Sequence, residues 1–583
     1  MNKRQVLHII GKLPKSLQQI QIAKLLYILK AWKTLSANDE IDKTDLNYET
    51  FFNSRLEAKK LSEIFSSLAK TSKLFELFLG QGNILSKISD QDLISLFGVV
   101  EIHPEFINVN EMFYSLLEGT YDYSVTNQIA ELGVKLLGNT CDEVYAPFSN
   151  SLNLTYFTDK KVYAESMADE FIIELMKILD GVDITFIHTD TLAEPAYINE
   201  NAPHLLRKFS CCLSFPPMGL ATGHALKNED KFNRFRIHKG KSHRDVAHVE
   251  HILAQTKFKA VILLPVGMTY RAGTELELRK YLIDNNLLEA IIQLPLNLHN
   301  ATSIETTFFI INRKKQDTNV YFLNLKDKQF LSKDGRKTVL SDSDMVIDLY
   351  ENKKIIENIS SFISKEVIVQ NNYALSIDRY IISQEAAKIQ EQLNKYELVE
   401  LQEIADVKRS QLFQDEDEGA EIYEVSPSDL ATSGFTITGG KLKHVSKQIK
   451  KLGTYMLKDF DILVSTKGTI GKVGIVIPEK GYLVASQAMQ VIRLKNPSGG
   501  EAHILYMYLK SDIGQSLLKQ LVAGVAMPQI STIEMKKFKV PMLTDNEKEQ
   551  VLLNFNNEIK MYNEINKINT NIKKIHSNFL GAK

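Results

Sequence analysis

Short apolar runs alternate with helical segments across residues 143–312, and this alternation constrains the fold more than any other feature. The runs are EVYA (143–146), KVYAES (161–166), ITFIHT (184–189), FSCCLSF (209–215), KAVILLP (259–265), EAIIQLP (289–295) and TTFFIIN (306–312). Strands that alternate with helices predict a parallel α/β sheet covered on both faces. Such sheets bind ligands at the carboxyl ends of their strands, so we expect a site in the loops after Tyr145, Ala164, His188 and Leu213.

The flanking segments predict further domains, as a chain of 583 residues requires. Residues 1–110 carry apolar side chains at helical spacing with little Gly or Pro, so we expect a helical N-terminal domain. Residues 331–397 contain charged helical segments and predict a helical connector. From residue 398 the pattern changes to short β-rich pieces with glycine turns, and residues 546–583 predict a long helix.

The overall composition excludes few classes of function. Lys+Arg is 70 and Asp+Glu is 71, so a nucleic-acid site would have to be a local basic patch. Cys141, Cys211 and Cys212 form neither a disulfide framework nor a zinc pattern, and we interpret them as buried small hydrophobes in a reducing cytoplasm. The N-terminus lacks a long apolar run, so we expect a cytoplasmic protein without a signal peptide or membrane span.

Two regions resemble prokaryotic type I restriction–modification proteins. Residues 263–315 show the LP-x-G, charged helix, strand ending in LP and T-S-I loop of the N6-adenine DNA methyltransferase subunit. The segments DILVSTKGTIGKVGIV, VASQAMQVIRL, YLKSDIGQSLLK and VAGVAMPQISTIEMKKFKVP are similar to one target-recognition domain of the specificity subunit. The resemblance implies a Rossmann-like methyltransferase fold with a mixed seven-stranded sheet at 111–330. It also implies an α+β target-recognition domain at 398–545 and a coiled-coil-type spacer helix at 546–583.

The cofactor loop departs from this family. The family form D-P-x-x-G-S-G lets the backbone approach the methionine half of S-adenosylmethionine, where a side chain would collide. Here the loop is YAPFSNSL, with Ala146 for the acid and Asn150 and Leu152 for the two glycines, while Pro147 and Ser151 are kept. The acid and both glycines are absent, so we expect no bound cofactor.

Two acidic positions match the family. Glu165 occupies the position that binds the ribose hydroxyls, and Asp190 the position that contacts the adenine amino group. The alternative is that both are ordinary acids that cap helices or loops.

The catalytic loop also departs from the family, whose Asn/Asp-Pro-Pro-Tyr/Phe motif holds a flipped adenine. Here it reads Phe215-Pro216-Pro217-Met218. Phe215 offers no acceptor to the adenine amine, and Met218 stacks less well than an aromatic ring. We therefore expect a pseudoenzyme that catalyses nothing with this loop.

The stretch from Lys441 to Lys472 contains eight lysines and two acids and favours DNA contact over a merely solvated face. We expect the contacts to come from Lys441, Lys443, Lys447, Lys467, Thr469 and Lys472. The SQ (486–487) and MPQIS (527–531) motifs are expected to shape loops rather than read bases.

Four histidines, His238, His243, His248 and His251, resemble a metal cluster at first sight. No cysteine or acidic pattern completes a metal site, so we interpret them as a solvated basic segment and expect no metal.

The long C-terminal helix carries an apolar stripe of Val551, Leu552, Phe555, Ile559, Tyr562, Ile565, Ile568, Ile572 and Ile575. In the family this helix pairs with a like helix, which predicts assembly, including homodimers; the alternative is that the stripe packs on its own domain.

The resemblance, together with the altered loops, therefore implies a non-catalytic, sequence-reading DNA-binding subunit of a restriction–modification or anti-phage defence system. Its expected partners are double-stranded DNA and other subunits, such as a nuclease or helicase. The alternatives are an active N6-adenine methyltransferase that uses S-adenosylmethionine, and a structural assembly subunit.

Overall fold

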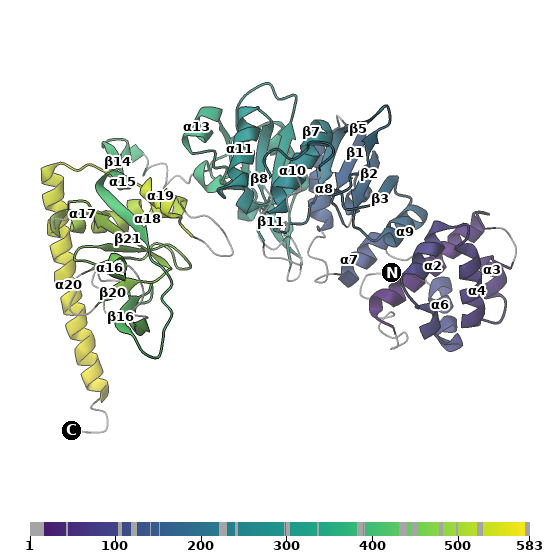
Figure 1. The fold of residues 1–583 in the computed structure, drawn as a ribbon, viewed down its shortest axis with the longest axis horizontal. Helices are drawn as coiled ribbons and strands as arrows, with labels where there is room; N and C mark the ends of the chain where they lie inside the picture. The colour runs from purple at the N-terminus through teal and green to yellow at the C-terminus, as the bar shows by residue number, and fades with distance from the viewer. Residues whose placement is uncertain are drawn as a thin grey trace. The chain divides into compact units, whose positions relative to one another are not determined.

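The chain forms two compact units in the computed structural model, Met1–Ile377 and Asp378–Lys583 (Figure 1). Within the described ranges, every helix is too short or too polar to cross a membrane. The structure describes residues 17–41, 45–102, 108–117, 125–139, 141–150, 152–220, 230–238, 243–295, 298, 304–334, 337–381, 389, 391–430, 440–445, 452–476, 482–496, 499–521 and 529–577.

The first unit begins with helices that surround Trp32. Helix α2 (Gln19–Ala37) is buried on nearly every side, which explains why its sequence is apolar all round rather than amphipathic. The Trp32 indole contacts the rings of Tyr48 and Phe65 at centroid distances of 5.2 and 5.4 Å. The neighbouring helices are α3 (Tyr48–Phe52), α4 (Ala58–Leu68), α5 (Lys73–Gly80), α6 (Asp90–Ile102) and α7 (Val109–Leu117). The described residues between Gln19 and Leu117 are therefore mostly helical.

A mixed sheet follows, with the strand order β13-β10-β8-β9-β7-β6-β1-β2-β3. Its strands are β1 (Glu143–Pro147), β2 (Lys161–Ser166), β3 (Ile184–His188), β6 (Phe209–Ser214), β7 (Thr256–Pro265), β8 (Leu288–Gln293), β9 (Thr306–Asn312), β10 (Val320–Asn324) and β13 (Ser360–Ile363). Strands β3, β2, β1, β6 and β7 are mutually parallel, whereas β9 runs antiparallel between β7 and β8. The seven apolar runs of the sequence form β1, β2, β3, β6, β7, β8 and β9.

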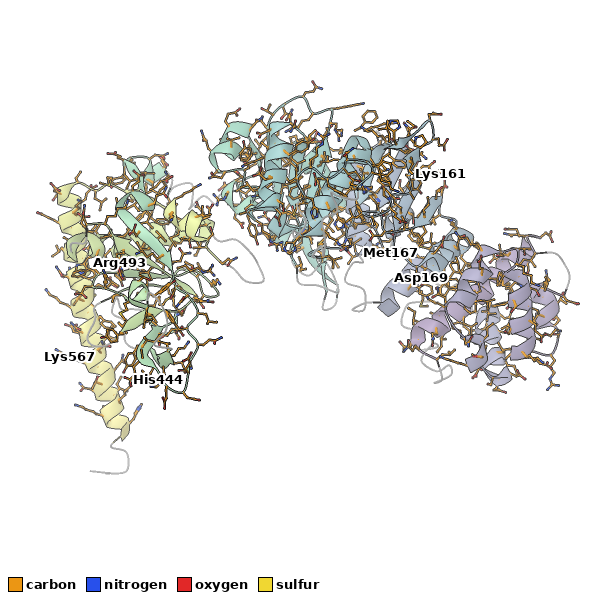
Figure 2. All side chains as sticks on the ribbon, in the orientation of Figure 1. Lys161, Met167, Asp169, His444, Arg493 and Lys567 are labelled. Carbon is orange, nitrogen blue, oxygen red and sulfur yellow. A yellow bond between two sulfur atoms is a disulfide. The ribbon has the colours of Figure 1, made fainter. Side chains whose placement is uncertain are left out.

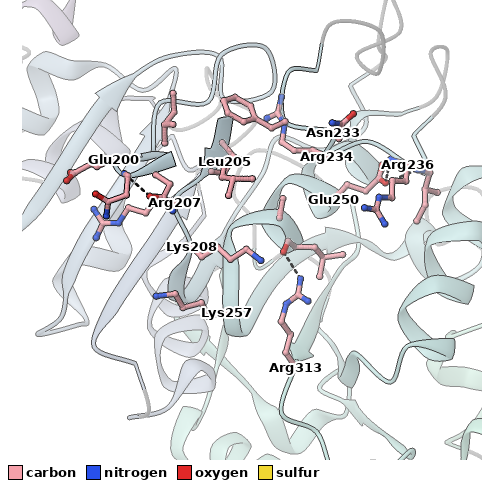
Figure 3. A pocket seen from close by; sticks show the side chains of 18 of the residues that line it. Glu200, Leu205, Arg207, Lys208, Asn233, Arg234, Arg236, Glu250, Lys257 and Arg313 are labelled. Carbon is pink, nitrogen blue, oxygen red and sulfur yellow. Dashed lines mark hydrogen bonds between the residues drawn. The ribbon is translucent and has the colours of Figure 1, made fainter. Parts of the chain in front are cut away.

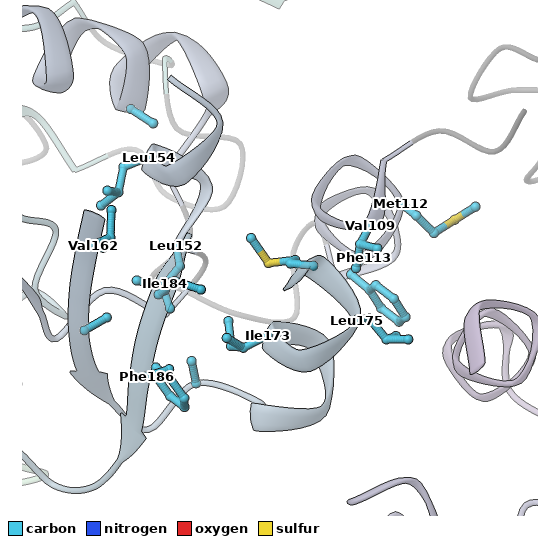
Figure 4. Close-up of a cluster of buried hydrophobic side chains, with 14 of the residues drawn as sticks. Val109, Met112, Phe113, Leu152, Leu154, Val162, Ile173, Leu175, Ile184 and Phe186 are labelled. Atoms are coloured by element: carbon cyan, nitrogen blue, oxygen red, sulfur yellow. The ribbon is translucent and has the colours of Figure 1, made fainter. Parts of the chain in front are cut away.

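Helices cover both faces of the sheet. Helices α8 (Asn127–Leu137) and α9 (Glu170–Asp180) share a core with Val144 and Ala146, whereas Tyr145 points the other way, to α10 (Arg244–Gln255). Figure 4 shows α9 between two apolar surfaces, with Ile173 toward the strands and Leu175 toward Phe113 of α7. This alternation along β1 decides which side chains reach each face.

Two expectations about this unit are corrected. The sheet has nine strands in the described residues rather than seven, because β10 and β13 extend the edge beyond β8. Residues 331–397 are therefore not purely a helical connector: they contribute β13 and the hairpin of β11 (Leu331–Asp334) and β12 (Lys337–Leu340) beside α12 (Ser343–Glu351) and α13 (Lys365–Gln370). Pairing with β10 satisfies the backbone N–H and C=O groups that β8 would expose as an edge strand.

The cysteine interpretation is also corrected. A disulfide joins Cys141 to Cys211, whose Cα atoms lie 5.7 Å apart. Cys141 precedes β1, and Cys211 pairs with Val144 on the adjacent strand β6. The separation of 70 residues hides this proximity in the sequence. Cys212 is buried and free, as expected of a small hydrophobe.

In the described residues the second unit contains three small sheets, with helices packed on them. Their strand orders are β15-β21-β18-β19, β17-β16-β20 and β14-β22. The strands are β14 (Leu398–Glu400), β15 (Ala405–Arg409), β16 (Ala420–Val425), β17 (Lys441–Val445), β18 (Ile462–Ser465), β19 (Val473–Ile475), β20 (Leu483–Ala485), β21 (Met489–Leu494) and β22 (Lys539–Pro541). The helices are α15 (Leu401–Ile404), α16 (Leu452–Tyr455), α17 (Gly499–Lys510), α18 (Asp512–Gln520), α19 (Thr532–Lys536) and α20 (Asp545–Ser577). The half-buried Arg493 of β21, labelled in Figure 2, forms an ion pair with the buried Asp461, the residue before β18.

Candidate functional site

The carboxyl ends of β1, β2 and β6 meet at one edge of the sheet, where the family places its cofactor and catalytic loops. Pro147 at the end of β1 lies opposite Glu165 of β2. Ser214 at the end of β6 donates from Oγ to the Pro147 carbonyl at 2.7 Å, and Phe215 N–H donates to Ser149 Oγ at 3.3 Å. The structure thus brings the cofactor loop, the acid after β2 and the catalytic loop together.

The loop after β1 is filled by its own side chains. Leu152 is fully buried in the core and has a left-handed backbone at φ 50°, a conformation that favours glycine. Phe148 is also left-handed at φ 64°, and its ring lies 4.5 Å from the ring of His248 and 5.2 Å from that of His251. Asn150 is half-buried, and Ser151 lies outside the described residues. In the family, glycines at the positions of Asn150 and Leu152 leave this loop without side chains.

Glu165 is completely buried, and both carboxyl oxygens already have protein partners. One oxygen is hydrogen-bonded to the Tyr145 hydroxyl, and the other accepts from Ala196 N–H at 2.6 Å. The Tyr145 hydroxyl also lies 2.7 Å from His251 Nε2 and 2.8 Å from Gln255 Oε1. Both oxygens are therefore engaged within the fold.

The hydrogen bonds of this buried network assign its protons. Arg234 donates to His251 Nδ1 at 2.9 Å, so the neutral ring carries its hydrogen on Nε2 and donates to Tyr145. The Gln255 amide nitrogen donates to two main-chain carbonyls, so Gln255 Oε1 accepts the one hydroxyl hydrogen of Tyr145. Glu165 then donates to the Tyr145 oxygen as a neutral carboxylic acid. Burial raises the pKa of Glu165, in agreement with this assignment.

Glu165→Gln is expected to preserve or raise the melting temperature near pH 8, because the amide reproduces the neutral acid. With a raised folded-state pKa, the stabilising contribution of Glu165 is fully present below its unfolded pKa. That contribution is lost as pH rises through the folded pKa, so the advantage of Gln should disappear toward pH 4.5. Calorimetry across pH measures this difference. Glu165→Leu, which removes both hydrogen bonds, should lower the unfolding free energy by about 1–3 kcal/mol, and a similar loss in Glu165→Gln would contradict the assignment.

Asp190 is exposed and caps a turn. Its carboxylate accepts from Leu192 N–H at 3.1 Å, and its carbonyl accepts from Glu194 N–H at 2.7 Å. This geometry is the loop-capping alternative that the sequence left open.

The catalytic loop turns its first side chain away from this edge of the sheet. Phe215 is 2% exposed and belongs to the core shared with α8, where Gly133 leaves room for its ring. A Cβ on Gly133 would lie 3.3 Å from Phe215 Cζ and 2.9 Å from a Leu213 methyl carbon. Pro216 is buried, whereas Pro217 and Met218 are half-buried.

The histidine segment is not solvated, which corrects the sequence interpretation. His238, His248 and His251 are at most 2% exposed. Burial lowers the pKa of His248 to about 3 and also lowers the pKa of His251, so both rings are neutral at ordinary pH. Within the described ranges no cluster of His, Cys, Asp or Glu is arranged to hold a metal.

Sequence reasoning missed Asp245, in the first turn of α10. It is fully buried, and its Oδ1 accepts from Gly219 N–H, directly after the catalytic loop, at 3.2 Å. Its Oδ2 has no hydrogen-bond partner among the described residues, and burial raises the pKa of this carboxyl. An acid in the first turn of a helix is common, so the sequence gives no signal for such a position.

The expected DNA-contact residues divide into exposed and engaged side chains. Thr469 is exposed and Lys467 is half-buried; Lys441 is exposed and pairs with Asp415 at 3.6 Å, while Lys447 lies outside the described residues. Lys443 is 9% exposed; it pairs with Glu424 at 2.6 Å and donates to the Phe413 carbonyl at 2.9 Å, so it is a structural cation.

Lys472 is also engaged, since its ammonium donates to the Pro427 carbonyl at 3.0 Å. Lys467 and Thr469 flank the turn between β18 and β19, where Gly468 and Gly471 have φ of 70° and 89°. Only glycine adopts these angles without strain, which fixes how the turn presents its side chains.

The described residues of the MPQIS motif lie beside this turn. Gln529 forms a β-bridge with Lys467, and Gln490 donates to the Ile530 carbonyl at 2.9 Å. These contacts join Gln529 and Ile530 to the turn and to β21; Pro528 lies outside the described residues.

Helix α20 has two different halves. Phe555 is 1% exposed and stacks on His503 at a centroid distance of 4.0 Å, and Ile559 and Tyr562 pack against the same core. The far half is uncovered: Ile565, Ile568, Ile572 and Ile575 are 43%, 57%, 44% and 69% exposed. The stripe therefore packs on its own unit only as far as Tyr562.

Two protein-family models match this chain, one on each side of residues 390–393. The model for the N-6 DNA methylase family matches residues 171–389, and that for the type I restriction modification DNA specificity domain matches residues 394–575. The type I restriction enzyme MpnII methylase subunit of Mycoplasma pneumoniae is 28% identical over 222 residues, which cover 35% of this chain and 39% of that protein. The MjaVII methylase subunit of Methanocaldococcus jannaschii is 27% identical over 176 residues, covering 28% and 30%. The chain thus spans less than two fifths of the length of these relatives.

Solved structures show the same fold. The type I restriction–modification methyltransferase subunit from Streptococcus thermophilus aligns with a TM-score of 0.52 at 18% identity, over 64% of this chain and 97% of that one. A chain from a structure of type I restriction–modification complex assembly aligns with a TM-score of 0.50 at 14% identity, over 67% and 94%. The chain therefore combines an N-6 DNA methylase domain with a type I restriction–modification DNA specificity domain.

Proposed function

We propose that this protein is a sequence-reading DNA-binding subunit of a prokaryotic restriction–modification or anti-phage defence system, whose methylase domain is a pseudoenzyme. It would act in the cytoplasm on double-stranded DNA, together with other subunits such as a nuclease or helicase. The proposal rests on the position of Phe215. Its side chain lies in the core, whereas the family uses the residue at this motif position to hold the target adenine.

The residues present do not fit S-adenosylmethionine. Glu165 has both oxygens engaged, and Leu152 and Phe148 occupy the loop that glycines leave open in the family. Asp190 uses its carboxylate to cap a turn. We derive no methyl transfer from this arrangement.

DNA reading is assigned to the second unit. Lys441 is exposed, with 70% of its side chain accessible, and Lys467 and Thr469 stand at a glycine turn that admits close backbone approach. Cations in such positions neutralise phosphates and release counterions, which makes affinity depend on salt.

Neutralising both lysines tests this assignment. Lys441→Ala with Lys467→Ala is expected to weaken duplex binding and to reduce the slope of log affinity against log salt by about 2. Fluorescence anisotropy over a salt series measures the slope, and sequencing of DNA fragments captured by the wild-type protein reveals any preferred site.

A matched control changes the same charge elsewhere. Lys59→Ala with Lys60→Ala, on exposed positions of α4, should leave the slope unchanged. An unchanged slope in the Lys441 and Lys467 variant, or captured DNA without any common motif, would contradict sequence reading and favour a structural assembly subunit.

An active N6-adenine methyltransferase with an atypical site is the alternative, and one observation favours it. Asp245 holds Gly219 beside the catalytic loop and has an unpartnered carboxyl oxygen, which could accept a hydrogen bond from an amine. Transfer of labelled methyl groups to mixed-sequence DNA that disappears in Asp245→Asn would establish this alternative.

A further inference from the structure

A second site opens at the opposite end of the sheet. A pocket of about 1040 Å³ is bounded by the hairpin of β4 (Ile198–Asn199) and β5 (Ala202–Leu206), the segment 232–237 and α10 (Figure 3). Glu143, Lys208 and Lys257 line it from the beginnings of β1, β6 and β7. Glu165 and Phe215 lie at the carboxyl ends of their strands, so this pocket is separate from the methyltransferase-like site.

Strand pairing brings three cations to this pocket. Lys208 precedes Phe209, which pairs with Thr256, the residue before Lys257. Arg313, after β9, donates its backbone N–H to the Phe258 carbonyl at 2.8 Å. Lys208, Lys257 and Arg313 thus come from three neighbouring strands to one end of the sheet (Figure 3).

Part of the pocket's charge is already compensated. Arg207 pairs with Glu143 at 2.8 Å, and Arg234 pairs with Asp230 at 2.8 Å. The Glu250 carboxylate accepts three backbone N–H groups from residues 236–238. These groups build the walls and leave little affinity for a ligand.

The remaining lining is positively charged. Lys208, Lys257 and Arg236 are exposed and form no ion pair with a described residue, and the Arg313 guanidinium donates to the Leu253 carbonyl at 2.6 Å. Against these four cations stands one exposed acid, Glu200. A concave surface with uncompensated cations attracts anions, because its field lines are focused into the cleft.

Apolar side chains lie beside these cations. Ile198, Leu205 and Tyr281 line the pocket and are 38%, 50% and 37% exposed. Apolar walls with a few charged groups are typical of sites for small organic ligands, and the pocket's volume suits such a ligand better than a flat run of duplex phosphates.

We propose that this pocket binds a nucleotide. Its phosphates would lie against Lys208, Lys257 and Arg313, while its base packs on Leu205 and Tyr281. A mononucleotide is favoured over a nucleic-acid strand because these cations line one concave pocket instead of forming a track along the surface. This site does not depend on whether the methylase domain is active or whether the second unit reads DNA.

Binding of a fluorescent ATP analogue to the full-length protein, followed by anisotropy, tests the proposal. We expect saturable binding that unlabelled ATP displaces and that S-adenosylmethionine does not. Lys208→Glu with Lys257→Glu should weaken binding at least about 100-fold, since each charge-assisted contact contributes roughly a factor of ten. Lys161→Glu makes the same charge change at the start of β2, outside the pocket, and should change the dissociation constant by less than about twofold (Figure 2).

Three results would overturn the assignment. The first is no saturable binding by the wild-type protein, and the second is equal binding by the double variant, with its fold verified by thermal melting. The third is displacement by pyrophosphate or by a short oligonucleotide as effective as that by ATP, since the pocket would then recognise phosphate alone or a nucleic-acid strand.

Discussion

No transfer of methyl groups from S-adenosylmethionine to DNA is expected from the purified protein, and no micromolar affinity for the cofactor. The adenine amine needs an acceptor at the first position of the catalytic loop, and Phe215 offers a hydrocarbon ring that packs against α8. Losing a preorganised contact to the reacting group typically reduces the rate by about 10²–10³, and here the cofactor loop is altered as well. Calorimetry with the cofactor and a labelled-methyl assay on mixed-sequence DNA measure both expectations.

Phe215→Asn is expected to leave the protein inactive and to lower its unfolding free energy by about 3 kcal/mol or more. The substitution restores the family residue but removes a buried ring and places an amide in an apolar core. Met218→Leu, at a half-buried position of the same loop, is the control and should change stability by less than about 1.5 kcal/mol. Recovery of methyl transfer in Phe215→Asn would show that the site needs only this one acceptor.

Charges on the exposed half of α20 are expected to abolish assembly. Ile565→Lys, Ile568→Lys and Ile572→Lys together place cations on a stripe that is otherwise 43–57% exposed and unpartnered among the described residues. Light scattering, with the protein alone and with neighbouring gene products, should show loss of the larger species. Affinity for a specific site should fall about 100-fold or more, because one recognition domain reads only half of a two-part site.

The control places the same charge on the other side of the helix. Asn563→Lys, Asn566→Lys and Thr570→Lys lie away from the stripe and should leave both mass and affinity unchanged. A wild-type protein that is monomeric in every mixture, with full DNA affinity after deletion of residues 546–583, would contradict the assembly prediction.

The spacing of apolar residues predicted most strands and helices of this fold, because buried positions recur at regular intervals along each strand or helix. The seven apolar runs became strands β1, β2, β3, β6, β7, β8 and β9, and the convergence of the loops after Tyr145, Ala164 and Leu213 followed from parallel pairing. The extra strands β10 and β13 were missed, since four- and five-residue runs among charged helices resemble connectors. The disulfide was missed because two cysteines 70 residues apart carry no register information.

The sequence alone predicted which groups of the family's methyltransferase site are replaced: the acceptor, by Phe215, and the bare backbone, by Asn150 and Leu152. Only the tertiary structure decided what the remaining side chains do. Glu165 and the histidines are committed to a buried network, Lys443 is a structural cation and Lys441 is exposed. Residue type fixes a group's capacity to bind or donate. Its burial and partners are set by residues far away in the chain, and they decide whether that capacity is free for a ligand.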